Sequence, residues 1–109
     1  MAILNLEKDK KLLVATLRKL KSSKDLSLFI DDLLTEEEIL DLSQRIKIAK
    51  LILDGKTYDE IAVKVQTSTS TVSKIGQIIK YGKGGLRKTL GKKEHYFVTA
   101  LKMGLAEDK

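Results

Sequence analysis

Five hydroxyl side chains stand in an unbroken row in the middle of the chain, from Thr67 to Thr71. Each hydroxyl can donate and accept a hydrogen bond, and each threonine adds a methyl group. Such a row is typical either of a solvated linker or of a surface that binds a polar partner. In the second case the hydroxyls could bond to phosphate oxygens or to the edges of nucleic-acid bases, while the methyl groups could meet the thymine methyl. The residues around the row distinguish the two interpretations.

The hydroxyl row lies inside a basic segment without a single carboxylate. Residues 61–93 carry eight basic and no acidic side chains, although the whole chain has 15 acidic residues and a net charge of +6. Positive charge gathered in one segment is the electrostatic footprint of a protein that binds a polyanion. We therefore expect a polyanionic partner for this segment.

Catalytic and metal chemistry find little support. The chain has no cysteine and one histidine, so a disulfide and a zinc site built from Cys and His are both excluded. His95 has no nucleophile beside it, and we expect it to have a surface or interface role. The glycines of Gly82–Gly85 lack the preceding strand and the terminal Lys-Ser/Thr of a phosphate-binding loop. The sequence therefore predicts neither an enzyme nor a bound cofactor.

The composition indicates an all-α protein. Its 109 residues suit a single core, 42% of them are hydrophobic, and proline is absent throughout. Long segments rich in Leu, Ile, Lys and Glu without proline favour helices. No apolar run approaches ~18 residues, and the first residues lack the apolar centre of a signal peptide. We therefore expect a cytoplasmic protein with no membrane partner.

Apolar spacing and capping residues predict the positions of the helices. Asn5 is the expected N-cap of the first helix, and Ser23 or Asp25 that of the second. Capping boxes open the third and fourth helices at Thr35–Glu38 and Thr57–Glu60. Residues 86–93 receive no prediction. The predicted helices are 6–20, 26–34, 36–54, 58–65, 68–81 and 94–105.

The helix predicted over 36–54 is apolar on more than one side, and Gly55 is its expected left-handed stop. A helix that is apolar on two sides must be buried on two sides. Either a partner subunit or a central place in a monomer would bury it, and both remain open at this point. Its two apolar stripes contain Ile39, Leu42, Ile46, Ala49 and Leu53, and Leu40, Ile48, Leu51 and Ile52.

Residues 57–81 are typical of a helix-turn-helix, in which two short helices are joined by about three residues. Ala62 lies where the two helices are expected to touch, and a larger side chain there would push them apart. Ser68 is the expected N-cap of the second helix. Gln66 stands where such turns often carry glycine, because the backbone is left-handed and a non-glycine residue costs about 1–2 kcal/mol there. The shared interior is expected to contain Ile61, Val65, Val72 and Ile75.

The first turns of the second helix are the predicted base-contacting surface. In a helix-turn-helix this end of the helix points into the DNA major groove. Hydroxyls there can bond to base acceptors, a glutamine can pair with adenine, and a lysine can reach guanine or a phosphate. The predicted base-contacting residues are Thr69, Ser70, Thr71, Ser73, Lys74 and Gln77.

The neighbouring polar and basic residues are predicted to contact the DNA backbone. A solvated basic tail is the alternative for those that follow the second helix. Each phosphate contact is expected to steepen the salt dependence of binding by about 0.9. The predicted backbone contacts are Ser68, Lys64, Lys80, Lys83, Arg87 and Lys88, and Lys92 and Lys93 continue the same basic run.

Short motifs follow one another through residues 26–85: Leu34-Thr-Glu-Glu-Glu38, Leu42-Ser-Gln-Arg45, Gly55-Lys-Thr-Tyr58, Ser68-Thr-Ser-Thr-Val-Ser73 and Tyr81-Gly82. This series resembles the Trp-repressor superfamily, and within it a bacterial branch of Trp-repressor-related proteins. The resemblance implies an all-helical, intertwined homodimer with two helix-turn-helix heads. A partner subunit would also account for the doubly apolar helix over 36–54.

The resemblance further implies a tryptophan site, which this chain matches only in part. Thr35 and Arg45 match a threonine and an arginine that hold the corepressor in Trp repressor. A second arginine is replaced by Lys74, which lacks the planar guanidinium, and the glycine that leaves room for the indole is replaced by Ile75. We therefore do not expect tryptophan as a ligand. Thr35 is expected to act as a helix cap and Arg45 as an ion-pair partner.

Taken together, these features predict one all-helical domain over 1–109, with a helix-turn-helix at 57–81 and a basic extension over 82–109. They predict a sequence-specific, repressor-like regulator of transcription that binds double-stranded DNA as a homodimer. Two alternatives remain. One is a nucleic-acid-binding protein that is indifferent to sequence, and the other is a helical protein-interaction module whose helix-turn-helix does not contact DNA.

Overall fold

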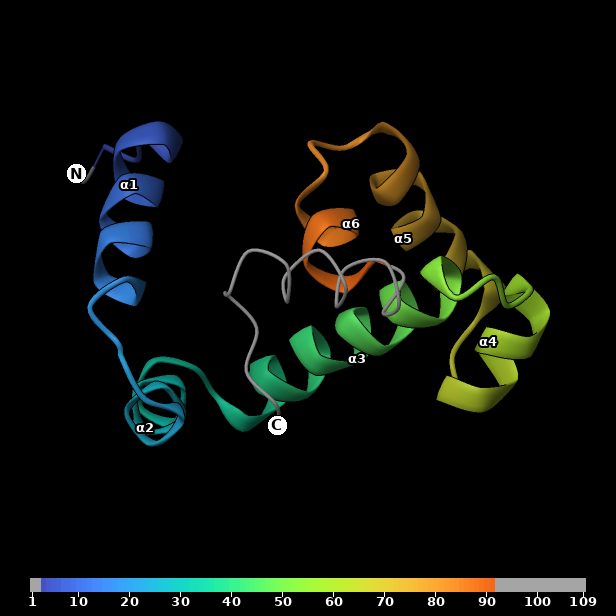
Figure 1. Ribbon diagram of the computed structural model, residues 1–109, viewed down its shortest axis with the longest axis horizontal. Helices are drawn as coiled ribbons and strands as arrows, with labels where there is room; N and C mark the ends of the chain where they lie inside the picture. Colours follow the sequence, from blue (N-terminus) through green and yellow to red (C-terminus); the bar gives the residue numbers. More distant parts are fainter. Residues whose placement is uncertain (1–2, 92–109) are drawn as a thin grey trace, which may run out of the picture. The chain divides into compact units, whose positions relative to one another are not determined.

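A computed structural model describes residues 3–91, and every regular element in this range is a helix (Figure 1). The all-α prediction is confirmed. The helix predicted over 94–105, His95, Lys92 and Lys93 lie outside the described residues. No helix in the described range is long and apolar enough to cross a membrane. The helices are α1 (Leu6–Leu17), α2 (Ser23–Leu33), α3 (Glu36–Leu53), α4 (Tyr58–Val65), α5 (Thr69–Tyr81) and α6 (Gly85–Leu90).

Helix α1 is shorter than predicted. Asn5 caps it as expected, but the helix ends at Leu17 instead of residue 20. Near its end the Thr16 hydroxyl donates to the carbonyl oxygen of Leu12 at 2.8 Å. Such a back-bond competes with the regular backbone ladder and weakens the last turn, which favours an early end.

Helix α2 begins three residues earlier than predicted, and both expected caps, Ser23 and Asp25, are wrong. The N-cap is Ser22, whose extended backbone leaves Ser23 as the first helical residue. The Ser22 hydroxyl accepts the backbone N–H of Asp25 at 3.1 Å. With Ser22 as cap, the Asp25 carboxylate falls in the first helical turn, where the helix dipole favours negative charge.

The two predicted capping boxes are present. Before α3, Thr35 donates its backbone N–H to a Glu38 carboxylate oxygen at 2.9 Å, and its hydroxyl accepts the Glu38 N–H at 3.1 Å. Before α4, Thr57 and Glu60 repeat the pattern at 2.9 and 3.1 Å. Each box satisfies two backbone donors that the helix itself leaves unpaired.

A tight corner links α3 to α4. Gly55 has a φ of 88°, which is the left-handed stop expected from the sequence. Its N–H donates to the Ile52 carbonyl oxygen and the Lys56 N–H donates to that of Leu51, both at 3.0 Å. This pair of bonds closes the end of α3 in a Schellman motif, so the chain turns within a few residues and enters α4 at once.

The chain divides into two compact units, Met1–Leu40 and Asp41–Lys109, with the boundary inside α3. The first unit contains α1 and α2, and neither helix has a buried side chain. Its exposed large apolar residues are Ile3, Leu4, Leu6, Leu12, Leu13, Val14, Leu17, Leu26, Leu28, Leu33 and Leu40. Phe29 and Ile30 of α2 are half-buried, but helices with apolar faces and no fully buried side chain lack the covering layer that would stabilise them in water.

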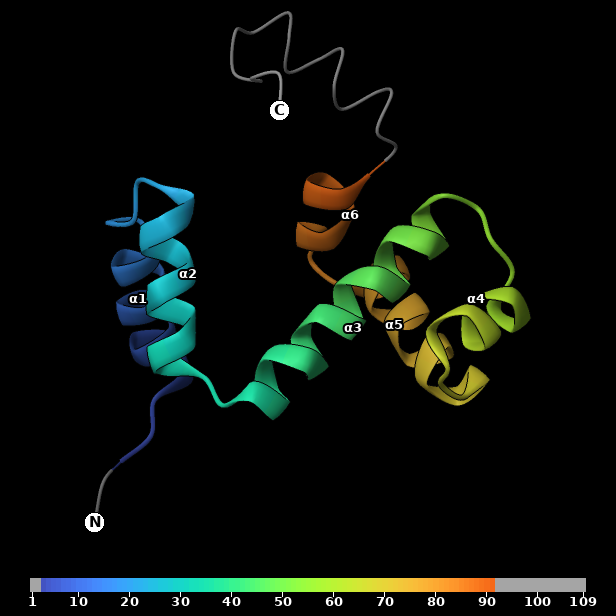
Figure 2. The ribbon, with the colours of Figure 1, turned by 90° about the horizontal axis from the view of Figure 1, so that it is seen from below.

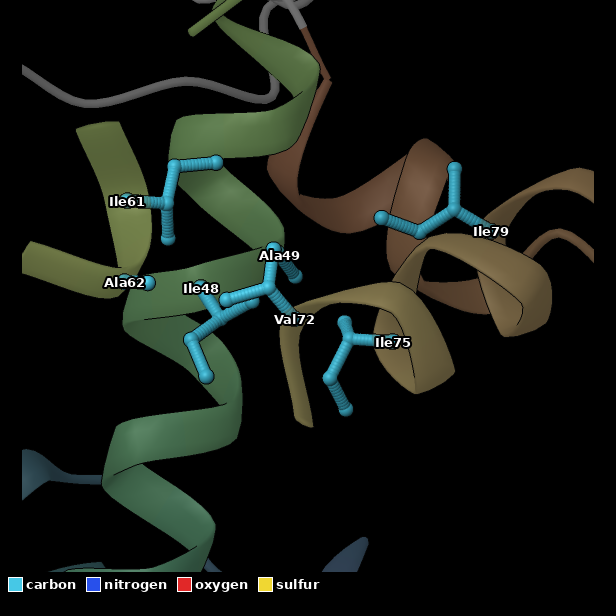
Figure 3. Packing of buried hydrophobic residues seen from close by; sticks show 7 residues of the cluster. All are labelled: Ile48, Ala49, Ile61, Ala62, Val72, Ile75 and Ile79. Atoms are coloured by element: carbon cyan, nitrogen blue, oxygen red, sulfur yellow. The ribbon is translucent and has the colours of Figure 1, made fainter. Parts of the chain in front are cut away.

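The second unit has a continuous core. Figure 3 shows its seven buried side chains converging from α3, α4 and α5, with Ile48, Ile61 and Val72 almost fully enclosed. Helices α4 and α5 lie against the C-terminal half of α3 (Figures 1 and 2). Partly buried residues complete this core, among them Tyr58, Val65, and Leu86 and Leu90 of α6. The core residues are Ile48, Ala49, Ile61, Ala62, Val72, Ile75 and Ile79.

Candidate nucleic-acid interface

Helices α4 and α5 form a helix-turn-helix with the predicted bounds. Helix α4 ends at Val65, and Gln66 has φ 61° and ψ 55°, the left-handed conformation expected for this turn. The N–H of Thr67 donates to the Ala62 carbonyl oxygen at 2.9 Å, which folds the turn back on α4. Ala62 is only 8% exposed. Its small side chain is what allows the two helices to approach closely.

A tyrosine and a glycine fix the contact between these helices, and sequence patterns alone missed the pair. The Tyr58 ring lies directly over Gly76 of α5, so that any side chain added at Gly76 would collide with the Tyr58 hydroxyl. Gly76 is buried on the inner side of α5. A mid-helix glycine is unfavourable in itself, which makes close packing its usual reason. The mid-helix Gly76 was therefore a visible sign of close packing in the sequence, but nothing in the sequence identified Tyr58 as the residue packed against it.

The N-terminus of α5 is held by Ser68. Its hydroxyl accepts the backbone N–H of Thr71 at 3.1 Å and lies 3.0 Å from the Thr71 hydroxyl. Ser68 is exposed, whereas Thr71 is half-buried. Of the predicted base-contacting residues, Thr71 is the one whose hydroxyl has a partner within residues 3–91.

The other predicted base-contacting residues share one side of α5. At 100° per residue, positions 69, 70, 73, 74 and 77 fall within one side of the helix, opposite the buried Val72 and Ile79. Ser73 is half-buried, and the rest are exposed: Thr69, Ser70, Lys74 and Gln77. The structure therefore presents a polar face of hydroxyl, ammonium and amide groups that begins at the helix N-terminus.

The predicted backbone-contacting residues are all exposed, and they come from several elements. Lys64 belongs to α4, Lys80 to α5, and Lys83 to the following loop. Among residues 3–91 the only ion pair joins Arg45 to Asp41 at 3.5 Å, so none of these cations is neutralised by a carboxylate in that range. Their charge stays available to an external anion.

Helix α6 was not predicted, and it orients two of the cations. Leu86 and Leu90, one turn apart, pack against the core of the second unit. Arg87 and Lys88 are exposed between them. The spacing of the two leucines was the available signal, but two apolar residues after a glycine-rich loop are too few to establish a helical period.

A cavity of about 310 Å³ opens between α3 and α5. Arg45 and Asp41 form their ion pair at its edge, with side chains 60% and 63% exposed. Ile75 contributes a branched side chain that is only 6% exposed, and Lys74 contributes an ammonium in place of a planar guanidinium. Both features argue against an indole in the cavity, and the absence of a tryptophan ligand stays a prediction. The lining residues are Asp41, Gln44, Arg45, Ile48, Thr71, Lys74, Ile75 and Ile78.

Thr35 is used as a helix cap, as expected. Its hydroxyl accepts the Glu38 N–H and also lies 3.2 Å from the Glu38 carboxylate. One carboxylate pKa is perturbed in the neighbouring box. The backbone N–H of Thr57, and next its hydroxyl, hold the pKa of Glu60 below the ordinary value of 4.5.

Comparison with known proteins gives consistent results. The Trp repressor protein family matches residues 8–94. The Bacillus subtilis (strain 168) protein YerC, described as uncharacterized, is 36% identical over 63 residues, which make up 58% of this chain and 61% of YerC. A crystal structure of a candidate Trp repressor from Staphylococcus aureus superposes with a TM-score of 0.66 at 26% identity, over 97% of this chain and 100% of the other.

Proposed function

Because this chain belongs to the Trp repressor family of non-enzymatic DNA-binding regulators, we propose that it is a sequence-specific, repressor-like regulator of transcription that binds double-stranded DNA as a homodimer. One observation carries the proposal. The polar face of α5 that contains Thr69, Ser70, Lys74 and Gln77 is exposed, and it lies in a segment that contains cations and no carboxylate.

The mechanism follows from what each part can bind. In this motif the N-terminal half of α5 enters the major groove, where hydroxyl, ammonium and amide groups distinguish base edges. Cations on α4, α5 and α6 contact phosphates, which fixes the register of the helix on the duplex without selecting a sequence. Base contacts then account for specificity, and phosphate contacts for most of the salt-dependent affinity.

The homodimer is supported by uncovered apolar residues. In the first unit Leu12 and Leu28 are 69% and 55% exposed, and in the second unit Leu42 and Ile46 are 43% and 46% exposed. Large apolar side chains exposed in this number favour an interaction surface. A second copy of the chain would cover it, and a two-fold dimer would bind a near-palindromic site with half-sites about one DNA turn apart.

The proposal is tested by selecting bound sequences from a pool of random duplexes and then measuring affinities of the full chain. The variant Ser70→Ala/Lys74→Ala should weaken binding to the selected duplex about tenfold or more and binding to random duplexes much less. The matched control, Lys24→Ala/Ser27→Ala, removes the same two side-chain types from exposed positions of α2. It should leave both affinities within about twofold, a change of less than 0.5 kcal/mol.

Three results would contradict parts of the proposal. Equal losses on selected and random duplexes would exclude base contacts by Ser70 and Lys74. Failure to enrich any motif would favour a nucleic-acid-binding protein indifferent to sequence. No association with DNA even at ~50 mM salt would exclude DNA binding and favour a protein-interaction module, since phosphate contacts are strongest at low salt.

A further inference from the structure

A second basic surface has lining residues that are distinct from the polar face of α5. It is an open groove of about 600 Å³ between the C-terminal half of α3 and the end of α4. This volume falls within the range of roughly 300–1,000 Å³ that is common for small-molecule sites. We call it the lysine groove, and its lining residues are Lys47, Lys50, Leu51, Asp54, Lys64, Val65 and Gln66.

The charge of the lysine groove is unbalanced. Lys47 and Lys50 enter from α3 and Lys64 from α4, against the single carboxylate of Asp54. Asp54 directly follows the end of α3, four residues after Lys50, yet within residues 3–91 the ion pair of Arg45 is the only one that forms. Three ammonium groups on one groove repel each other, and an anion between them would lower that energy.

The floor of the lysine groove is apolar. Leu51 and Val65 are half-buried, and both pack against the core of the second unit. Lys47, Lys50 and Lys64 are exposed, so the groove combines this apolar lining with cations on long, flexible side chains. Apolar lining residues together with a few charged groups are typical of a site for a small organic ligand.

We propose that the lysine groove binds a small organic polyanion, a compact molecule with two or more negative charges carried by phosphate or carboxylate groups. Its charged groups pair with Lys47 and Lys50 on one side and with Lys64 on the other, and its body rests on Leu51 and Val65. The site shares Lys64 with the predicted DNA-backbone contacts, but it shares no residue with the polar face of α5 or with the α3–α5 cavity. Its existence does not depend on the proposed function.

The experiment titrates the ¹⁵N-labelled full chain with pyrophosphate in one series and citrate in another, at constant ionic strength. Backbone amides of Leu51, Val65 and Gln66 should shift and saturate with at least one of the two probes. Saturation with pyrophosphate alone assigns a phosphate ligand, with citrate alone a carboxylate ligand, and with both the shared polyanion chemistry.

Three variants decide whether the lysines form the site. Lys47→Gln/Lys64→Gln should weaken binding about tenfold or more, since each lost charged hydrogen bond is substantial. Lys10→Gln/Lys19→Gln removes the same charge from an exposed position of α1 and an exposed position of the turn that follows it, and should change binding less than about twofold. Asp54→Asn removes the carboxylate that lines the lysine groove within residues 3–91 and should tighten binding, whereas a general loss of structure would weaken it.

The proposal is overturned if the shifts fail to saturate, or if both lysine pairs weaken binding equally. It is also overturned if a random duplex, and neither probe, moves the groove amides, because the lysine groove would then be a DNA-backbone surface. A chain that binds no DNA but passes the titration would refute the proposed function and leave the lysine groove intact.

Discussion

The two compact units are built from similar helices but differ in what their apolar faces contact. In the second unit seven apolar side chains from three helices pack into one core. In the first unit α1 and α2 bury none, although both carry leucines at helical spacing. Apolar periodicity therefore reveals that a helix has a face to cover, but not whether the cover comes from the same chain.

The difference also separates two sources of stability. The core of the second unit comes from residues of one chain, so its stability should not depend on protein concentration. The apolar faces of the first unit need a covering layer, and in the proposed homodimer that layer is a second copy. Stability that comes from association rises with protein concentration by mass action.

The largest expected effect is on the core of the second unit. Ile48→Ala removes a fully buried side chain and leaves a cavity, which should lower the free energy of unfolding by about 2–5 kcal/mol. Val63→Ala on α4 changes a side chain that is 79% exposed and should cost less than about 0.5 kcal/mol. Urea unfolding at two protein concentrations measures both. A similar decrease in the free energy of unfolding for both variants would show that this core does not dominate the stability of the protein.

A smaller effect is expected on the first unit, and it should appear in association. Leu12→Ser/Leu28→Ser replaces two exposed leucines on α1 and α2. The dimer dissociation constant should rise about tenfold or more, corresponding to at least 1.4 kcal/mol. Sedimentation over a range of concentrations measures it. A chain that sediments as a monomer at micromolar concentration, or a variant that dimerises as tightly as the parent, would remove the second copy as the covering layer.

The smallest effect concerns the capping box of α4. Because hydrogen bonds from Thr57 hold the pKa of Glu60 below 4.5, its charge stabilises the fold above that pH, and this contribution disappears as pH falls through the lower folded pKa. Glu60→Gln keeps an acceptor but cannot titrate. The stability difference between parent and variant should be constant at neutral pH and change only below 4.5. Unfolding free energies from about pH 3 to 7 measure it, and a difference independent of pH would exclude the charge as the cause.

The sequence predicted best where the signal is local. The capping boxes at Thr35 and Thr57, the left-handed Gly55 and Gln66, and the cap at Ser68 all depend on residues within one turn of each other. In a capping box, a threonine and a glutamate three residues later bond to each other's backbone N–H, so the two residues alone mark the start of a helix. This is why the bounds of α4 and the end of α5 agree with prediction, and why the helix-turn-helix could be recognised from spacing.

Prediction failed where the structure depends on a residue distant in sequence, or where two adjacent residues are equally suited to the same role. Two consecutive serines could each cap α2, and Ser22 does so instead of Ser23. Helix α6 forms because Leu86 and Leu90 find the core, a contact that no local pattern contains. The pairing of Tyr58 with Gly76 also joins residues on different helices. Contacts of this kind require the fold before they can be named.

The short corner at Gly55 has a mechanical consequence. The Schellman motif joins α3 to α4 by a short, hydrogen-bonded turn. Ile48 and Ala49 of α3 also share a core with Val72 of α5, so we expect the helices of the second unit to move together as one rigid body. A rotation of α3 about its axis would then displace the N-terminal end of α5 as well. Within the second unit, a displacement of α3 would therefore be passed to α5 through the shared core.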